Sequence, residues 1–405
     1  MKLGIGAQLC SPAPSYRNAG ISRHIRGPVH AIGRIEGSSE KQHMRVFINA
    51  RFLTQSITGV QRYAVELIKA LDRLIDSGEV DSSRYSFTLL SPRDRKSDLG
   101  LVHIPLKQVG CLRGHLWEQF ELPLYTRGRD LLSLCNAAPL FKRNQVVTIH
   151  DAAVFAVPGT YPIAFRAWYQ VLLQRLCRTS AGIITDSAFS KSELIKYCRP
   201  DPTRVHVIYL GKEHVFSADS DESILEKHGL GTRPFVLAVS SMTFNKNFRS
   251  IVRAIELLGR DCFDTAIVGG VNPRVFTQSN LPLSDTVKHL GYVTDGELRA
   301  LYEHAACFIF PSFYEGFGLP PLEAMACGCP VITSNAASLP EVCGDAALYC
   351  DPYSPEDIAA KIALLMSDEA LRDSLHKKGL ARARQFTWEQ TARQTLEVYR
   401  EALAP

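Results

Sequence analysis

The chain has 405 residues, more than a single hydrophobic core usually holds, so two domains are expected. Its 46 basic and 41 acidic residues leave a net charge of only +5, which does not indicate nucleic-acid binding. No apolar run approaches the roughly 18 residues that a membrane-spanning helix needs.

The eleven cysteines form no C-x-x-C pair, and several lie in apolar segments, such as Cys177 and Cys307. This usage predicts reduced, buried thiols in a cytoplasmic protein. Cys327 and Cys329 are too close together to indicate a zinc site, and no histidine cluster accompanies them. We therefore expect no metal.

Residues 1–43 keep no helical or strand period long enough to bury a face. Three interpretations remain open: a disordered basic tail, an arm that touches a membrane or partner, or an extension upstream of the true start. We assign residues 1–43 as a disordered N-terminal extension. Because a strand pattern follows Met44 at once, we expect Met44 to be the functional start.

Residues 44–215 alternate short apolar runs with helical patterns, which predicts a Rossmann-like domain. Strands are predicted at 46–50, 86–90, 130–134, 146–149, 181–187 and 205–209. Gly59 is predicted to form a small-residue turn before the first helix. Arg62, close to that turn, is a weaker candidate for a ligand contact. Ser190 and Glu193 have the spacing of a capping box for a later helix.

His150 and Asp151 directly follow the strand predicted at 146–149. Ligands of open α/β sheets bind beyond the carboxyl ends of the strands. His150 is therefore a candidate catalytic residue, and Asp151 is a weaker one that could orient its imidazole or bind an acceptor.

Residues 216–234 are polar and are assigned as the interdomain linker, and residues 235–385 as a second Rossmann-like domain. Its strands are predicted at 235–239, 265–268, 289–293, 305–310 and 330–333. Lys246 lies where the first of these strands leads into a helix, and a cation there would neutralise a diphosphate. Residues 386–405 form the last predicted helix.

The apolar run 305–310 leads into a glycine turn at residues 315–318 and then into a helix. Pro320 and Pro321 suit the first helical turn, and Gly328 can end the helix. A strand, a glycine turn and a helix N-terminus together predict a phosphate site, because free backbone N–H groups and the positive helix dipole end face the ligand.

Four residues of this segment are expected to contact the diphosphate through their backbone: Gly316, Phe317, Gly318 and Leu319. Glu323, in the first helical turn, could accept hydrogen bonds from a ribose diol. Glu315 precedes the turn, where it could meet a polar group beyond the phosphates. We interpret the two carboxylates together as functional.

Glu315 and Glu323, separated by seven residues, resemble the Glu-x7-Glu motif of the family-four retaining glycosyltransferases. The resemblance covers about residues 44–405. It implies an α/β fold with two Rossmann-like domains facing across a cleft, the GT-B arrangement, and metal-independent transfer of a sugar from a nucleoside diphosphate. It also implies that the helix over 386–405 crosses back to the N-terminal domain.

The resemblance further implies roles for single residues. His150 and Glu315 would approach the transferred sugar, and Lys246 would hold the diphosphate. Gly59 would touch the diphosphate or the acceptor. The base pocket would be lined by Tyr292 and Val293, which are weaker candidates.

One position departs from that family. The family usually has an arginine as well as a lysine in the turn of Lys246, but this chain has Ser240 or Asn245 there. Arg51, Arg62 or backbone N–H groups could compensate.

The expected function is transfer of a hexose, with GDP-mannose as the first choice of donor and a UDP-sugar as the alternative. The resemblance implies a lipid-linked saccharide acceptor in surface polysaccharide or lipopolysaccharide biosynthesis. It also implies a peripheral contact with the inner membrane face. A nucleotide-sugar epimerase, a phosphorylase and a nonenzymatic nucleotide-sugar-binding protein remain alternatives.

Overall fold

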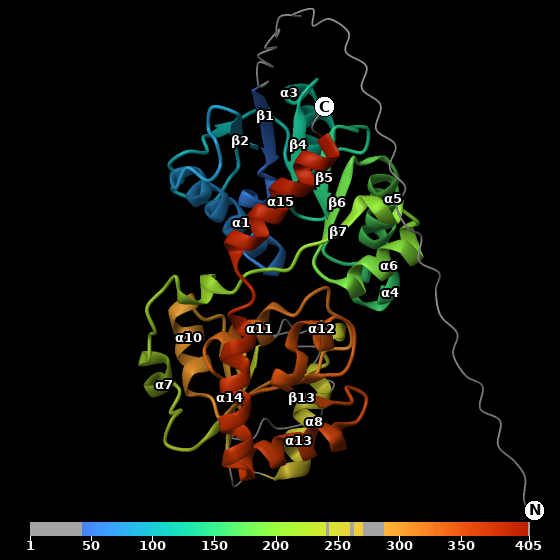
Figure 1. The fold of residues 1–405 in the computed structure, drawn as a ribbon. Coiled ribbons are helices and arrows are strands. Elements are labelled where there is room, and N and C mark those ends of the chain that lie inside the picture. The colour runs from blue at the N-terminus through green and yellow to red at the C-terminus, as the bar shows by residue number, and fades with distance from the viewer. Residues whose placement is uncertain (1–42, 240–242, 260–262, 270–286, 404–405) are drawn as a thin grey trace, which may run out of the picture. The chain divides into compact units, whose positions relative to one another are not determined.

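The computed structural model describes residues 43–239, 243–259, 263–269 and 287–403 (Figure 1). The predicted N-terminal extension over 1–43, apart from His43, lies outside the described residues. The same holds for Ser240, one of the two residues at the departing arginine position.

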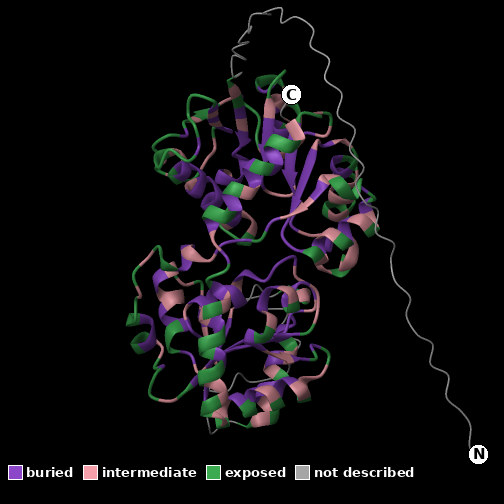
Figure 2. Cartoon of the chain, viewed as in Figure 1, coloured by how far each residue is buried: buried purple, intermediate pink, exposed green. Residues whose placement is uncertain are grey.

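The first sheet has seven parallel strands in the order β3-β2-β1-β4-β5-β6-β7. These strands are β1 Met44–Asn49, β2 Tyr85–Ser91, β3 Leu106–Gln108, β4 Asp130–Ser133, β5 Gln145–Thr148, β6 Gly182–Thr185 and β7 Val205–Val207. Strands β5 and β6 are buried throughout, as their apolar runs predict (Figure 2). The sequence prediction missed β3, because this three-residue edge strand has no apolar run.

The second sheet has six parallel strands in the order β10-β9-β8-β11-β12-β13. They are β8 Phe235–Val239, β9 Asp264–Val268, β10 Val287–Gly291, β11 Cys307–Phe310, β12 Val331–Ser334 and β13 Ala347–Cys350. Both sheets reverse their direction of winding beside their first strand, β1 or β8, which is the doubly wound order of Rossmann-like domains.

The helices that connect the strands of the first sheet are α1 Gly59–Asp76, α2 Gly114–Leu116, α3 Leu122–Tyr125, α4 Ala153–Ala156, α5 Ile163–Thr179 and α6 Ala188–Cys198. Those that follow are α7 Ser223–Lys227, α8 Phe248–Leu258, α10 Asp295–His304, α11 Leu319–Ala326, α12 Leu339–Cys343, α13 Pro355–Ser367, α14 Glu369–Ala383 and α15 Trp388–Leu403. Short 3-10 turns include η1 Arg51–Thr54, η3 Pro158–Thr160, η5 Glu213–Phe216 and η6 Phe244–Lys246.

The capping box predicted at Ser190 and Glu193 is wrong. Helix α6 begins three residues earlier, where Ser187 is the N-cap and its Oγ accepts a hydrogen bond from the Ser190 N–H at 3.0 Å. Glu193 instead pairs with Lys196 at 3.0 Å. The spacing alone could not identify the N-cap, because helical sequence follows both Ser187 and Ser190. The backbone geometry makes Ser187 the N-cap.

The chain passes between the two sheets twice, first after β7 and again between α14 and α15 (Figure 1). The two crossings touch. Thr391 Oγ donates to the carbonyl of Tyr209 at 2.8 Å, and the Trp388 N–H donates to Glu213 Oε2 at 3.1 Å. Helix α15 then packs on the first sheet, where the Tyr399 hydroxyl donates to Asp130 Oδ2 at 2.6 Å.

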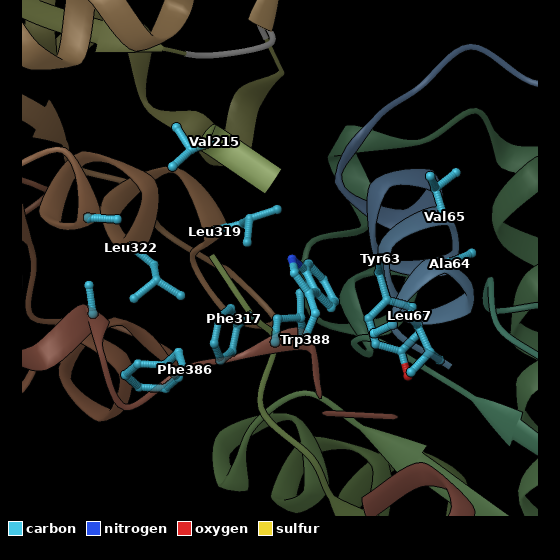
Figure 3. Packing of buried hydrophobic residues seen from close by; sticks show 14 of the residues in the cluster. Tyr63, Ala64, Val65, Leu67, Val215, Phe317, Leu319, Leu322, Phe386 and Trp388 are labelled. Atoms are coloured by element: carbon cyan, nitrogen blue, oxygen red, sulfur yellow. The ribbon is translucent and has the colours of Figure 1, made fainter. Parts of the chain in front are cut away.

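Trp388 lies at the centre of this crossing and is only 1% exposed. Its ring centroid is 6.1 Å from that of Tyr63 on α1. Figure 3 shows the indole between Tyr63 on one side and Phe317 and Leu319 on the other. A single cluster of buried apolar side chains therefore continues from helix α1 to helix α11 through Trp388.

The crossing requires glycine at position 211. A Cβ atom at Gly211 would lie 2.2 Å from the backbone nitrogen of Trp388, which cannot move aside as a flexible side chain could. We expect Gly211→Ala to lower the free energy of unfolding by roughly 3 kcal/mol, the upper range of overpacking effects. Chemical denaturation followed by circular dichroism would measure this loss.

Gly159→Ala is the matched control, because a Cβ atom there would meet nothing within 4 Å. Its effect should stay within about 0.5 kcal/mol. Equal stabilities of the two variants would show that the two crossings do not press on each other at Gly211.

Candidate functional site

An ion pair joins Lys246, at the end of η6 after β8, to Glu315, which follows β11. Lys246 Nζ lies 2.7 and 2.8 Å from the two carboxylate oxygens of Glu315. The side chains are 20% and 10% exposed, so water reaches the pair only partly. Ser312 Oγ also hydrogen-bonds the Glu315 carboxylate. The structure thus joins two residues for which the sequence predicted separate contacts with a donor.

The side-chain amide of Asn245, one of the two residues at the departing arginine position, donates to the carbonyl of Tyr314 at 3.3 Å. The Phe313 N–H returns a hydrogen bond to the carbonyl of Asn245 at 2.8 Å. These bonds fasten the 3-10 turn η6 to the residues that precede Glu315. They therefore fix the position from which Lys246 reaches its partner.

The two glycines of the turn allow close packing within the protein. A Cβ atom at Gly316 would lie 2.6 Å from the carbonyl oxygen of His150, and one at Gly318 would lie 2.7 Å from a methyl group of Leu339. Gly318 also has φ +111, a conformation that side chains disfavour. Protein atoms thus lie on the Cβ side of both glycines. The close approach of their backbone to a diphosphate stays a prediction.

The turn is held against the first sheet by two serines. The Gly316 carbonyl accepts hydrogen bonds from Ser187 Oγ at 2.6 Å and Ser190 Oγ at 3.0 Å. Ser187 is also the N-cap of α6, so its hydroxyl accepts from its own helix and donates to the turn. Sequence reasoning missed this contact, which joins residues 129 positions apart.

Helix α11 begins at Leu319, as predicted, with Gly318 as its N-cap. Pro320 and Pro321 have no N–H group, and the Leu322 N–H faces the Gly318 carbonyl at 3.4 Å. In the first turn of α11, Leu319 is therefore the residue whose N–H is best placed to bind an anion. The N-terminus of α11 therefore offers fewer free backbone N–H donors than the sequence suggested. A bound diphosphate would depend more on a cationic side chain.

Glu323 is 9% exposed and has a protein partner at each carboxylate oxygen. His214 Nε2 lies 2.7 Å from Oε1, and the Tyr302 hydroxyl lies 3.0 Å from Oε2. Burial, reinforced by the Glu323 carboxylate, raises the pKa of Tyr302 well above its ordinary value, so this hydroxyl keeps its proton as a donor. Ribose binding by Glu323 stays a prediction, and it would use the lone pairs that remain on the two oxygens.

His150 is 4% exposed and both of its ring nitrogens face protein acceptors. Nδ1 lies 2.8 Å from Asp186 Oδ2, and Nε2 lies 3.0 Å from the carbonyl oxygen of Leu134. A carboxylate and a carbonyl can only accept, so both nitrogens carry protons and the ring is an imidazolium. The predicted contact with a sugar hydroxyl stays a prediction, and through Nε2 it would require exchange of the Leu134 bond.

The charge on this ring has a clear cause. Burial acts to lower the pKa of His150, but the Asp186 carboxylate outweighs burial and raises the pKa to about 10. Asp186, not Asp151, therefore orients the imidazole. The prediction that Asp151 could take this role is wrong, because the Asp151 Oδ1 faces the N–H of Ala153 at 2.8 Å.

Asp151 instead lines a pocket of about 380 Å³ beside the start of helix α1. The other lining residues are Arg51, Gln55, Thr58, Val60, Gln61, Cys135, Asn136, Val154, Tyr161, Phe165, Tyr169 and Leu173. Burial raises the pKa of Asp151, against the opposing effect of the Ala153 N–H and His150. The Cβ of Asp151 is 3.0 Å from the position of a Cβ at Gly316, so this pocket borders the glycine turn.

Three aromatic rings form one wall of the pocket. The Tyr161 and Phe165 centroids are 5.5 Å apart with an interplanar angle of 15°, and those of Phe165 and Tyr169 are 4.3 Å apart at 24°. Flat rings in the same pocket as carboxylate and amide groups suit a ligand with both apolar and hydroxyl-bearing faces. Sequence reasoning missed this stack, although the three aromatic residues are four positions apart, with Tyr161 just before α5 and the other two within it.

Arg51 is buried and pairs with Glu118 at 3.0 Å. Burial raises the pKa of Glu118, but Arg51 and hydrogen bonds from His115 and Asn49 outweigh it and lower the pKa. Arg51 is thus committed to a structural carboxylate. It would have to leave that partner to replace the missing arginine of the donor turn.

The weaker candidates and the predicted donor-binding residue Gly59 lie in different environments. Arg62 pairs with Asp295 of α10 at 2.6 Å, and Tyr292, one residue beyond β10, is 90% exposed. Val293 packs against the buried apolar cluster. Gly59 begins α1 with no atom within 4 Å of a Cβ position, which leaves open space at the helix N-terminus.

Two general features of the described residues concern the environment of the site. Across the described ranges, no helix combines the length and apolar character needed to cross a membrane. Within those ranges, no group of three or more histidine, cysteine, aspartate or glutamate side chains is arranged to hold a metal ion.

Solved structures share this architecture. Sucrose-phosphate synthase from Thermosynechococcus elongatus superposes with a TM-score of 0.70 at 19% identity, covering 89% of this chain and 100% of that one. WaaG, a glycosyltransferase involved in lipopolysaccharide biosynthesis, gives a TM-score of 0.65 at 16% identity, covering 89% and 100%. The fold class is therefore that of the GT-B glycosyltransferases, with two Rossmann-like α/β domains, as predicted.

Sequence relatives define the family. The chain is 31% identical over 384 residues to O-antigen chain mannosyltransferase B of Escherichia coli, covering 88% of this chain and 100% of that protein. It is 26% identical to O-antigen chain mannosyltransferase RfbU of Salmonella typhimurium, covering 82% and 93%. Residues 220–382 match the family of glycosyl transferases group 1. The chain belongs to this family and is a glycosyltransferase.

The buried His150–Asp186 pair predicts a specific pH dependence of stability. A histidine in the unfolded chain has a pKa near about 6.5, whereas folding raises that of His150 to about 10. The pair therefore stabilises the fold fully below pH ~6.5, and this contribution is lost as the pH rises toward 10. The stability advantage of the wild type over His150→Gln should shrink steadily across this range in urea denaturation.

Asp186→Asn provides the independent comparison, since it removes the carboxylate that raises the pKa of His150. It should lose the same pH-dependent part of the stability. An advantage of the wild type that grows or stays constant with rising pH would contradict the imidazolium assignment.

Proposed function

We propose that this glycosyltransferase moves a hexose from a nucleoside-diphosphate sugar to a saccharide acceptor with retention of the anomeric configuration and without a metal. The observation that supports this most directly is the Lys246–Glu315 pair beside the glycine turn, together with Asp151 and its pocket, which also lie next to that turn. A cation, a carboxylate and a pocket with hydroxyl-binding groups thus border the same turn.

On donor binding, the diphosphate takes Lys246 from Glu315 and also receives the Leu319 N–H at the start of α11. Glu315 is then free to accept hydrogen bonds from sugar hydroxyls. A mostly buried ion pair favours such an exchange over simple dissociation, because neither charge is left without a partner. His150 meets a sugar hydroxyl from the other domain by exchanging the bond of its Nε2 to the Leu134 carbonyl, while Asp186 stabilises its positive charge.

In the transfer itself, the bond between the sugar C1 and the diphosphate oxygen breaks, and a bond between C1 and an acceptor oxygen forms on the same face. The acceptor hydroxyl gives its proton to the leaving diphosphate. Lys246 stabilises the negative charge that develops on the diphosphate as the bond breaks.

The acceptor occupies the pocket lined by Asp151 and the aromatic stack of Tyr161, Phe165 and Tyr169. A pyranose ring places C–H groups on one face, which pack on aromatic rings, and hydroxyls at its edges, which bind carboxylates and amides. Asp151 and Asn136 supply such polar groups in this pocket. This arrangement supports an oligosaccharide acceptor that continues along the stack.

GDP-mannose is the proposed donor, because the two most extensive sequence relatives described above are named as mannosyltransferases of O-antigen chains. The same names support a place in surface polysaccharide or lipopolysaccharide synthesis on a lipid-linked acceptor. A UDP-sugar is the alternative donor. A structural neighbour, Alr3699/HepE of Anabaena, was solved with UDP and glucose, at 18% identity.

Nucleotide binding and turnover test this proposal together. One nucleotide among GDP, UDP, ADP and dTDP should raise the melting temperature, by mass action, equally with and without Mg²⁺. Glu315→Gln should lower the rate of GDP release from GDP-mannose, with a mannose oligosaccharide as acceptor, by about 100-fold or more. Glu356→Gln, at an exposed glutamate far along the chain, is the matched control.

If Glu315→Gln turns over as fast as the control, the assignment of Glu315 to the sugar is wrong. Stabilisation only in the presence of Mg²⁺ would contradict the metal-independent part of the proposal. Stabilisation by UDP rather than GDP would overturn the proposed base and favour the alternative donor.

We also propose that this enzyme contacts the anionic inner membrane face through an apolar-basic face of the first domain. Its apolar members are Phe120, Leu124, Phe141 and Val171, which are 63%, 72%, 86% and 59% exposed. Its exposed basic members are Arg127, Arg129, Arg143, Arg175 and Arg178.

Contacts within the structure bring these segments together. Lys142 Nζ donates to the carbonyls of Thr126 at 2.9 Å and Arg129 at 2.6 Å, and the Arg175 guanidinium lies 5.9 Å from the centre of the Phe141 ring. Exposed apolar side chains ringed by arginines suit an interface of lipid headgroups, where apolar groups insert and cations meet anionic lipid.

Vesicle sedimentation tests this face. The wild type should bind phosphatidylcholine vesicles that contain phosphatidylglycerol, and higher salt should weaken the binding. Arg175→Glu removes a positive charge and adds a negative one, so it should reduce binding by about 30-fold at about 1 kcal/mol for each charge near such a surface. Tyr353→Ser, at an exposed aromatic residue of the second domain, should bind as the wild type does. Equal binding by Arg175→Glu would exclude this face.

A further inference from the structure

Four buried side chains, Trp388, His214, Glu323 and Tyr302, form a continuous chain of hydrogen bonds. The Trp388 Nε1–H donates to His214 Nδ1 at 3.1 Å, and His214 Nε2 lies 2.7 Å from Glu323 Oε1. The Tyr302 hydroxyl donates to the other oxygen of Glu323 at 3.0 Å. Trp388, His214 and Tyr302 are 1%, 4% and 0% exposed, so water does not replace these bonds.

The chemistry of the donors decides the protonation of His214. An indole N–H can only donate, so Nδ1 of His214 must accept and carries no proton. The ring proton is therefore on Nε2, where it is donated to the Glu323 carboxylate. Trp388 thus selects the tautomer of His214 that binds Glu323.

This arrangement fixes the orientation of the carboxylate. Glu323 receives one neutral donor at each oxygen, which holds the plane of its carboxyl group and leaves further lone pairs on both oxygens. Neither donor brings a formal positive charge, so the carboxylate keeps its full negative charge for a ligand. A carboxylate held in this way loses less conformational entropy when it binds a pair of hydroxyls.

We propose that His214 is a positioning residue for the donor ribose, acting through Glu323, with its tautomer set by Trp388. The inference rests on the proposed function, which places the ribose diol at Glu323. It adds a residue outside the Glu-x7-Glu segment, located in η5 of the first crossing between the sheets. Trp388 begins the second crossing, so both connecting segments contribute to the ribose contact.

The location distinguishes His214 from a residue that only fills the core. Helices α10 and α11 could by themselves supply the Tyr302 contact, because both belong to the second domain. His214 instead comes from the connecting segment, held there by the Glu213 bond to the Trp388 N–H at 3.1 Å and by the tight approach at Gly211. Figure 3 shows the Trp388 indole near Leu319 of α11, the helix that carries Glu323.

Discrimination between ribose and 2′-deoxyribose tests the proposal. Calorimetry would compare GDP with 2′-deoxy-GDP, and UDP with 2′-deoxy-UDP, on the wild type, His214→Leu and His214→Gln. For the nucleotide that it binds, the wild type should bind the ribonucleotide about tenfold or more tightly than the 2′-deoxyribonucleotide. This factor corresponds to the loss of one hydrogen bond to a charged group. His214→Leu should weaken ribonucleotide binding and bring the two affinities within about threefold of each other.

His214→Gln keeps an N–H group that can reach Glu323, so it should recover most of the preference. A purely structural role would weaken the ribonucleotide and the deoxyribonucleotide equally in His214→Leu, and that result would overturn the inference. So would a preference in His214→Leu equal to that of the wild type. Should His214→Leu not fold, Trp388→Phe removes only the indole N–H and part of the ring, and it must also reduce the preference.

The wild type itself separates this inference from the proposed function. A wild type that binds a ribonucleotide and its deoxy form equally well would show that Glu323 does not hold the ribose, and the proposed donor site would then fail. A wild type that discriminates, together with a His214→Leu variant that still discriminates, would leave the donor site in place and reject only the role of His214.

Discussion

The approach of Gly211 to Trp388 is the contact on which much of this molecule depends. The chain connects its two sheets twice, and the two connections share one tightly packed point where a single methyl group would not fit. The indole at this point continues the apolar core of the first sheet toward helix α11. Trp388 also donates hydrogen bonds to Glu213 and His214, so the same residue fixes both the apolar packing and these polar side chains.

The buried charges of the site fall into two groups by their surroundings. Arg51 with Glu118 and His150 with Asp186 are almost fully enclosed, and both pairs have further hydrogen bonds that fix them. The Lys246–Glu315 pair is more open, with 20% and 10% of its side chains exposed. A fixed pair shapes the site, whereas a pair that water and ligands can reach is able to exchange partners.

The positions of most strands and the segment around Glu315 could be predicted from the sequence, because apolar runs, glycine turns and prolines act over short distances along the chain. The start of α11 at Leu319 followed from such local signals. Contacts between distant positions had no local signal: His214 and Glu323 are 109 residues apart, and nothing in the polar segment around His214 marks it.

Two predictions failed for a related reason. A candidate pair such as His150 and Asp151 looks like a functional unit because the residues are adjacent, but adjacent residues after a strand point in different directions. The imidazole therefore meets Asp186, which follows the neighbouring strand β6, and Asp151 faces the pocket. Similarly, the cap of α6 depended on backbone geometry, which two nearby serines do not reveal by spacing alone.

The position of helix α15 has a consequence for any attempt to divide the molecule. This helix follows the second sheet in the chain, but it packs against β5 and β6 of the first sheet. Its buried residues include Thr395, Leu396, Val398 and Tyr399. A cut in the segment between β7 and β8 would therefore leave the first half without the cover of its own sheet, exposing Tyr63 and its neighbours. A separable first domain would have to be assembled from two pieces of sequence, with residues 388–403 joined to it by a new connection.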